Sequence, residues 1–173
     1  MRPQDRLATA RLSQQADQIE NADPAYRAQL RAWTTDDPRC EDGVPAYAVS
    51  HVDAGAEDDV PIRDFDTRGV GWLPTRTRSS LNQCLLLFGA LQDNPMAWLR
   101  AGEALERMLL EIAAGGYAAS PFTQVIEVAR TNEQLRRELR LRMHPYVLLR
   151  VGRAQATLAT RRRRLVDVLT EAG

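Results

Sequence analysis

Apolar side chains recur at steps of three and four residues along positions 95–114, and this spacing predicts an amphipathic helix. Asn94 is a favourable N-cap residue and Pro95 suits the first helical position, so we expect the helix to begin there. We expect one face to be buried, with Trp98 and Met108 packed in the core rather than against a cofactor. The stripe consists of Trp98, Ala101, Leu105, Met108, Leu109 and Ile112.

Gly115 and Gly116 are expected to end this helix, because a residue without Cβ readily takes the left-handed conformation that satisfies the last carbonyls. Residues 117–123 contain mostly small residues around Pro121, and they are predicted to form a turn with accessible backbone groups.

The other periodic segments predict a mixed α and β architecture. Helices are expected over residues 5–20 and from Asp23-Pro24, which has the form of an N-cap followed by a first-turn proline. Apolar runs at residues 82–88 and 146–151 predict two central strands. Thr131 and Gln134 have the spacing of a capping box and predict a helix that runs to about residue 141.

Residues 34–78 form a segment of about 45 residues with many glycines and prolines and few periodic apolar positions. Loops of this length in a compact domain are usually functional, so we expect an acidic lid or an arm that embraces a second subunit. No linker divides the chain, and residues 1–173 are therefore expected to form a single domain.

The net charge is zero, but it is unevenly distributed. Residues 20–66 carry twelve acids and four arginines, whereas residues 130–164 carry eleven arginines and two acids. All 23 basic residues are arginine, which reflects coding bias or a preference for bidentate contacts with anions. The zero net charge and the 6% aromatic content argue against a nucleic-acid-binding protein.

Several other classes are disfavoured by residue content. Cys40 and Cys84 lie far apart in unlike contexts, so we expect reduced thiols, and the isolated His51 and His144 give no metal-ligand spacing. No apolar run approaches the roughly 20 residues of a membrane span, and residues 1–18 lack the apolar core of a secretory signal. We therefore expect a cytoplasmic protein without a metal site.

Five phrases occur in an order that resembles one family. They are DGVPAYAV (residues 42–49), PIRDFD (61–66), DNPMAWLRAGEALERMLLEIAAGGYAASPFTQVIEV (93–128), HPYVLLRVGRA (144–154) and TRRRRLVDVL (160–169). Together they resemble the carboxy-terminal half of nitroreductase-like flavoproteins of the Acg type, in which two nitroreductase-like halves are fused. The resemblance implies an α+β fold with an antiparallel sheet flanked by helices, and FMN bound between two halves or two subunits.

The resemblance also implies which residues bind the cofactor. The loop after the long helix would lie along the flavin ring and ribityl chain, with its backbone N–H groups near N5 and O4, and no catalytic side chain is required. The residues of this loop are Ala119, Ser120, Pro121, Phe122 and Thr123. Arg162 and Arg163 would bind the FMN phosphate, because guanidinium groups pair with phosphate oxygens in a bidentate manner.

Two departures from the family pattern affect this assignment. Arg164 stands where the family usually has proline, which leaves the register of the arginines open by one residue. Related proteins are about twice this long, and their amino-terminal arginine and serine phosphate contacts have no counterpart before Ala22. This chain is therefore expected to hold half of a flavin site.

Three functions remain open at this stage. The first is an oxidoreductase that uses NAD(P)H and FMN to reduce nitro compounds, quinones or similar small acceptors. The second is a non-catalytic protein that sequesters FMN beneath its lid. The third is a half-domain that completes its pocket with a partner half or as a homodimer.

Overall fold

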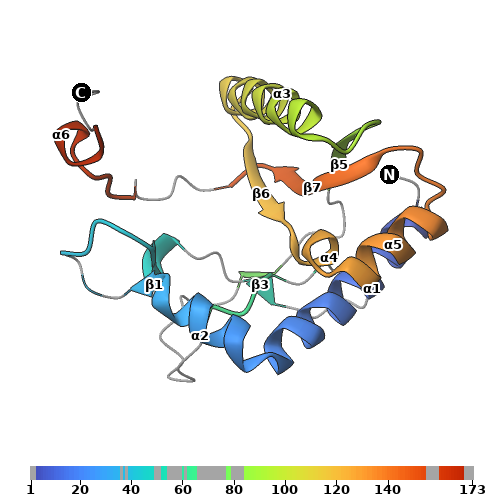
Figure 1. The fold of residues 1–173 in the computed structure, drawn as a ribbon, viewed down its shortest axis with the longest axis horizontal. Coiled ribbons are helices and arrows are strands. Elements are labelled where there is room, and N and C mark those ends of the chain that lie inside the picture. The colour runs from blue at the N-terminus through green and yellow to red at the C-terminus, as the bar shows by residue number, and fades with distance from the viewer. Residues whose placement is uncertain are drawn as a thin grey trace.

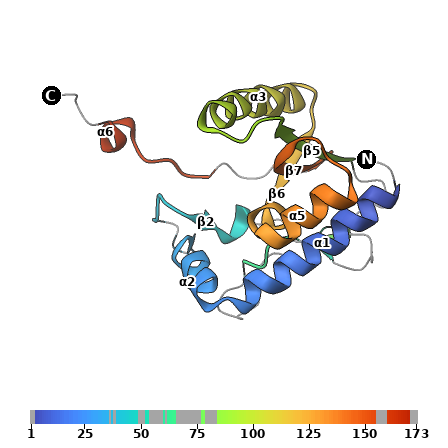
Figure 2. The same cartoon turned by 45° about the vertical axis from the view of Figure 1, so that its right-hand side comes forward.

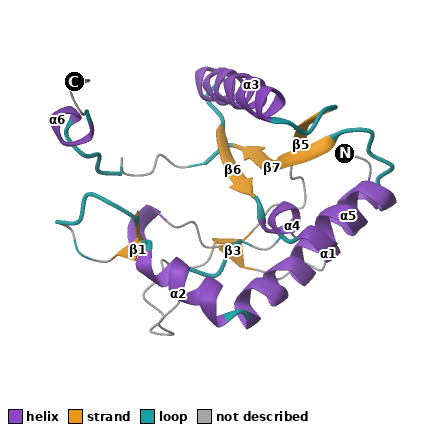
Figure 3. Ribbon diagram, viewed as in Figure 1, coloured by secondary structure: helices purple, strands orange, loops and turns teal. Residues whose placement is uncertain are grey.

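The computed structural model of the chain describes residues 3–35, 37, 39–48, 52–53, 60, 62–65, 77–78, 84–154 and 160–169. Helices and strands both contribute to it (Figure 3). The helices are α1 (Pro3–Ala22), α2 (Pro24–Ala32), α3 (Pro95–Ala114), α4 (Gln124–Glu127), α5 (Ala129–Glu138), α6 (Leu165–Val168) and the 3-10 turn Ala46–Ala48. The strands are β1 (Thr34–Thr35), β2 (Val44–Pro45), β3 (Val52–Asp53), β4 (Thr77–Arg78), β5 (Cys84–Ala90), β6 (Ala118–Phe122) and β7 (His144–Gly152).

The central sheet has three antiparallel strands in the order β5-β7-β6. Helix α3 lies on one side of it, and α1, α4 and α5 lie on the other (Figure 1). The predicted α+β class with an antiparallel sheet flanked by helices is therefore confirmed. Only β7 is central, however, because β5 is an edge strand of the described sheet rather than a second central strand.

The core lies between the sheet and helices α1, α4 and α5. Leu148 of β7 and Leu135 of α5 are fully buried there, and Leu12 of α1 packs in the same cluster. Val60 is also a member, with 2% of its surface exposed, although it comes from the predicted loop. Burial of these side chains is the main source of stability for this layer.

The predicted amino-terminal caps of two helices are confirmed. The Asp23 carboxylate accepts a hydrogen bond from the Ala25 N–H at 2.8 Å, and the Asn94 amide oxygen accepts one from the Ala97 N–H at 2.9 Å. Each cap satisfies an amide group that has no partner within the helix. At the other end of α3, Gly116 adopts a φ of +73°, which is a conformation that favours glycine.

Two local predictions are wrong. Residues 117–123 are not a turn, because Ala118 to Phe122 pair with β7 from Gly152 to Leu148 and form β6. Thr131 does not cap α5, which begins at Ala129. Its hydroxyl instead donates to the carbonyl oxygens of Val125 and Val128, both at 2.9 Å. In both cases the surrounding structure outweighs the local sequence preference.

The apolar face of α3 is less covered than expected. Of its residues only Ala97 and Ala101 are buried, Met108 is half-buried, and Trp98 is 53% exposed. The prediction that Trp98 lies in the core is therefore wrong. The reason is that α3 packs mainly on β5 and β6, which cover one side of the helix.

About half of the predicted loop at 34–78 lies outside the described residues. The parts that are described contain only two-residue strands and one short turn, as the sparse pattern predicted. The lid itself stays a prediction, and so does the start of the strand at Asn82. The described helices include no segment whose length and hydrophobicity would suit a membrane span.

Candidate functional site

The residues predicted to contact the cofactor ring lie on β6 and at its end. In the described sheet β6 pairs with β7 on one side only, so the other side of its backbone is not used by the sheet. Pro121 has no N–H and cannot donate a backbone hydrogen bond. In an antiparallel pair alternate N–H groups point away from the partner strand, so those on the outer side of β6 are the candidate donors of this segment.

Strand alternation places Ser120 and Phe122 on one face of β6, opposite Arg150 and Leu148, and Pro121 on the other face. The Phe122 ring is only 3% exposed and belongs to the core, where the Arg150 guanidinium lies 4.5 Å from the ring centroid. The side chain of Phe122 is therefore committed to packing, and Pro121 is the exposed member of the segment.

The arginine run lies on an exposed segment that leads into α6. Arg163 forms a bidentate pair with Asp42, with distances of 2.6 Å from Nε to Oδ1 and 2.5 Å from Nη2 to Oδ2. Arg162 donates to the Thr160 hydroxyl at 3.2 Å, and Arg164 pairs with Asp167. The contact with Asp42 agrees with the complementary charges of the acidic and basic segments.

The structure does not bring the two predicted parts of the site together within one chain. Helix α6 and the arginines before it lie apart from β6 in both views (Figures 1 and 2). Arg163 is held instead near the β1–β2 connection through Asp42. One ligand could touch both residues only if two polypeptides contribute, with Ser120 from one and Arg162 from the other.

A cluster that the sequence analysis did not assign lies next to Thr123. Arg63 Nη2 donates to the Thr123 hydroxyl at 3.2 Å and to both carboxylate oxygens of Glu127 at 2.9 Å. The guanidinium lies 5.7 Å from the centroid of the Tyr26 ring, close enough for a cation–π contact. With the buried Glu20, these residues form what we call the Arg63 cluster, which ties the 62–65 segment to the end of β6.

The two carboxyl groups of the Arg63 cluster differ in protonation. Burial raises the pKa of Glu20 to about 7, an effect reinforced by Glu127 and opposed by the Tyr26 hydroxyl and by Arg63. Burial also acts to raise the pKa of Glu127, but the Thr123 hydroxyl and Arg63 together hold it below its usual value. Near neutral pH, Glu127 is therefore the ionised partner of Arg63, while Glu20 is partly protonated.

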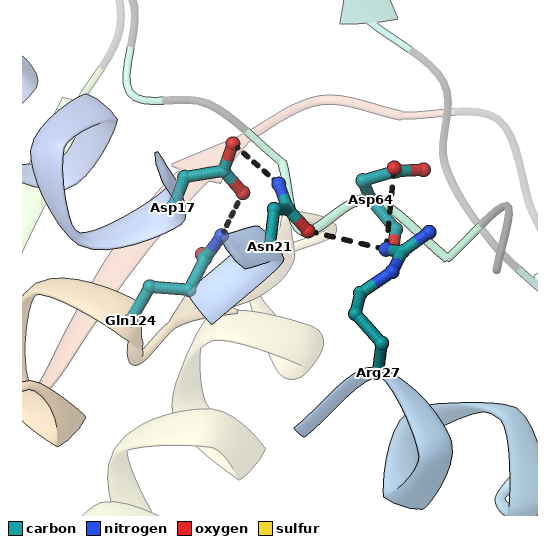
Figure 4. A network of polar contacts seen from close by, with 5 residues as sticks. All are labelled: Asp17, Asn21, Arg27, Asp64 and Gln124. Carbon is teal, nitrogen blue, oxygen red and sulfur yellow. Dashed lines mark hydrogen bonds and ion pairs between the residues drawn. The ribbon is translucent and has the colours of Figure 1, made fainter. Parts of the chain in front are cut away.

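A second polar network lies beside this cluster and joins the same elements (Figure 4). Asp17 accepts hydrogen bonds from the side-chain amides of Gln124 and Asn21, both at 3.0 Å. Asn21 accepts in turn from Arg27, which also donates to the Asp64 carbonyl oxygen at 2.9 Å. Gln124 is 2% exposed, so the network fixes the start of α4 directly after the predicted cofactor segment.

One sequence signal could have revealed the Arg63 cluster. Buried positions on α1 recur at three- and four-residue steps, and the last of them is Glu20, an acid on a face of small and apolar residues. An acid at such a position needs a partner. The partner itself could not be identified, because Arg63 comes from a segment without periodicity, 43 residues further along the chain.

The raised pKa of Glu20 predicts a specific pH dependence of stability. Its folded-state pKa of about 7 lies above the usual 4.5, so the folded chain binds more protons between these values. The contribution of Glu20 is fully present below about pH 4.5 and is lost as the pH rises through about 7. Glutamine has the shape of the protonated acid, so Glu20→Gln should remove this decline and should stabilise the protein at pH 8 relative to wild type.

Urea unfolding of both proteins at pH 5 and pH 8 measures the effect. Asp23→Asn is the matched control, because Asp23 is exposed at the start of α2. If the unfolding free energy changes by the same amount between pH 5 and pH 8 in wild type and in Glu20→Gln, the raised pKa of Glu20 is contradicted.

Comparison with known proteins identifies relatives of this chain in Mycobacterium tuberculosis. No protein-family model matches the chain. The chain is 30% identical over 167 residues to an uncharacterized protein of Mycobacterium tuberculosis, a match that covers 91% of this chain and 46% of that protein. It is 34% identical over 111 residues to a protein of the same organism described as "Putative NAD(P)H nitroreductase", with coverage of 64% and 32%.

These matches support a nitroreductase-like oxidoreductase family for this chain, and the antiparallel sheet flanked by helices is compatible with that fold. The chain spans less than half the length of these relatives. The second match covers about two thirds of the chain, so the relationship extends well beyond a short motif.

Proposed function

We propose that residues 1–173 form one nitroreductase-like domain that binds FMN and transfers electrons from NAD(P)H to a small acceptor, with a second polypeptide completing the site. The observation that carries the proposal is the similarity to the protein described as "Putative NAD(P)H nitroreductase". The proposed cofactor residues are Ser120, Pro121, Phe122, Thr123, Arg162 and Arg163.

The end of β6 suits contact with the flavin ring for two reasons. Its outer backbone edge is free of sheet pairing in the described structure, so N–H groups there can face acceptor atoms of a ligand. The Arg63 cluster and the Asp17 network hold the residues that follow, which fixes the position of Thr123. Fixed donors are what a flavin site requires, because they adjust the cofactor's potential without themselves titrating.

The arginine run suits a phosphate. Arg162 and Arg163 are exposed and adjacent, and guanidinium groups match phosphate oxygens in a bidentate manner. The contact between Arg163 and Asp42 already shows one of these side chains holding an oxyanion with two hydrogen bonds. A phosphate would have to displace Asp42 from Arg163.

A second polypeptide is proposed because β6 and the arginines lie apart in one chain, and because apolar surface is left uncovered. Leu99 and Leu110 of α3 are 69% and 60% exposed, and Leu165 and Val166 of α6 are exposed as well. Large exposed apolar patches commonly mark protein interfaces. The partner would be a second copy or a second nitroreductase-like half.

Bound FMN would supply the redox chemistry, accepting hydride from NAD(P)H and passing electrons to a nitro compound or quinone. The chain's own contribution is to position the ring with β6 and to neutralise the phosphate with the arginines. No side chain of the proposed site is required to transfer a proton.

Titration of the purified protein with FMN tests the proposal. Wild type should bind, and Arg162→Ala plus Arg163→Ala should lower the affinity at least about 100-fold, since each charged hydrogen bond contributes about 1.5–3 kcal/mol. Asp42→Asn frees Arg163 and should raise the affinity by no more than about fivefold, because exposed ion pairs are worth about 0.2–1 kcal/mol.

Arg130→Ala plus Arg137→Ala is the matched control, because it removes two exposed arginines from α5, which lies outside the proposed interface, and should leave the affinity unchanged. Size-exclusion chromatography with and without FMN should show the flavin in an assembled form. Wild-type protein that stays colourless at saturating FMN would overturn the proposal. Protein that binds FMN but oxidises no NAD(P)H with a nitroaromatic acceptor would instead favour sequestration.

A further inference from the structure

A cavity of about 590 Å³ opens between α3 and α5, beside the first residues of β7. Phe88 of β5 and Val147 of β7 form its floor, and they stand opposite each other on the face of the sheet that carries α3. The volume lies within the range of about 300–1,000 Å³ that is usual for small-molecule sites. The proposed flavin-binding residues do not line it, so it is separate from the site described above.

Two aromatic side chains of this cavity are held in place by hydrogen bonds. The Trp98 indole N–H donates to Asp93 Oδ1 at 2.6 Å, and the Tyr146 hydroxyl donates to the Gln92 carbonyl oxygen at 2.7 Å. The other oxygen of Asp93 lies 3.6 Å from His144 Nδ1. Because these rings are positioned before any ligand binds, little ordering cost remains for a planar molecule that packs on them.

The helix α3 leaves space above this floor. A Cβ built at Gly102, which lines the cavity, would meet no atom within 4 Å. The neighbouring Ala101 is small as well, so the helix contributes a shallow wall where larger side chains would fill the cavity. The room is therefore created by small residues at two adjacent helix positions.

Arg136 of α5 gives the cavity a positively charged group. Its Nε is buried without a hydrogen-bond partner, so a ligand in the cavity would meet the outer end of the guanidinium group. The two Nη groups at that end carry N–H donors that pair with an oxyanion. Glu133 and Asp93 also line the cavity, and their charges disfavour a ligand with two negative charges.

We propose that this cavity binds a planar aromatic monocarboxylate, with the carboxylate on Arg136 and the ring against Trp98, Tyr146 and Phe88. A carboxylate matches the planar guanidinium in a bidentate manner, and a single charge suits a lining that also contains acids. The aromatic walls favour a flat ring over an aliphatic chain because stacked rings gain more than area burial alone.

Isothermal titration with 2-naphthoate tests the proposal, with the neutral 2-naphthamide as the matched ligand. Wild type should bind the carboxylate more tightly than the amide, and Arg136→Gln should weaken naphthoate binding at least about 10- to 100-fold, because at least one charged hydrogen bond is lost. Arg137→Gln removes the same charge from the adjacent exposed position and should leave the affinity unchanged.

A blocking variant gives an independent measurement. Gly102→Leu should fill the cavity and abolish naphthoate binding without unfolding α3, because the new side chain meets open space and leucine favours helix more than glycine does. Arg162→Ala plus Arg163→Ala should bind naphthoate like wild type, which separates this site from the flavin proposal. Absence of naphthoate binding to wild type, or equal binding by Arg136→Gln and Arg137→Gln, would overturn the inference.

Discussion

Leu148→Ala is expected to lower the free energy of unfolding by about 3–5 kcal/mol, the upper part of the range for a fully buried leucine. Leu148 is 0% exposed at the centre of the sheet, opposite Leu87 on β5 and Phe122 on β6. It also belongs to the core cluster that joins the sheet to α1 and α5. The substitution removes apolar contacts from both layers and leaves a cavity that neither layer can easily close.

Urea unfolding followed by circular dichroism measures this loss. Leu110→Ala is the matched control, because the same substitution on α3 removes a side chain that is 60% exposed and should change stability by less than about 0.5 kcal/mol. Equal losses for the two variants would mean that Leu148 does not occupy the centre of the core. If α3 binds a second polypeptide, the Leu110→Ala effect should grow with protein concentration.

Gly89→Ala is expected to destabilise the protein by about 3 kcal/mol, at or above the upper end of the usual cost of overpacking. A Cβ at Gly89 would lie 2.0 Å from the His144 carbonyl oxygen and 2.9 Å from Pro145 Cα. Both atoms belong to the backbone of β7, so the two strands would have to separate. The register shifts between Phe88 and Gly89, where Pro145 on the opposite strand has no N–H to offer.

Gly102→Ala is the control for this substitution. Its Cβ would meet no atom within 4 Å, so it should stabilise α3 by up to about 1 kcal/mol through helix propensity. Thermal unfolding of both variants gives opposite shifts in Tm if the close approach of β5 and β7 is correct. A Gly89→Ala protein with the Tm of wild type would show that the strands do not meet closely at this position.

The candidate site could be predicted only in part. The segment at 119–123 and the arginines at 162–163 were located by resemblance, and their cofactor role remains a proposal. The Arg63 cluster was missed because its members come from α1, α2, the 62–65 segment and the start of α4. The exposed Trp98 was assigned to the core because a helical stripe shows which residues share a face, but not whether anything covers that face.

Local chemistry in the sequence determined where helices α2 and α3 begin and where strands β5 and β7 lie. Asn94 and Asp23 each accept a hydrogen bond from a backbone N–H in the first turn of the helix, and the proline that follows each of them has no N–H that needs a partner. The apolar runs of β5 and β7 require burial wherever they are placed. Only the tertiary structure decided that Ala118–Phe122 is a strand, that Thr131 bonds to preceding carbonyls and that Arg63 reaches Thr123. The physical reason is that these features depend on partners far along the chain or on the neighbouring backbone, which no local pattern of residues encodes.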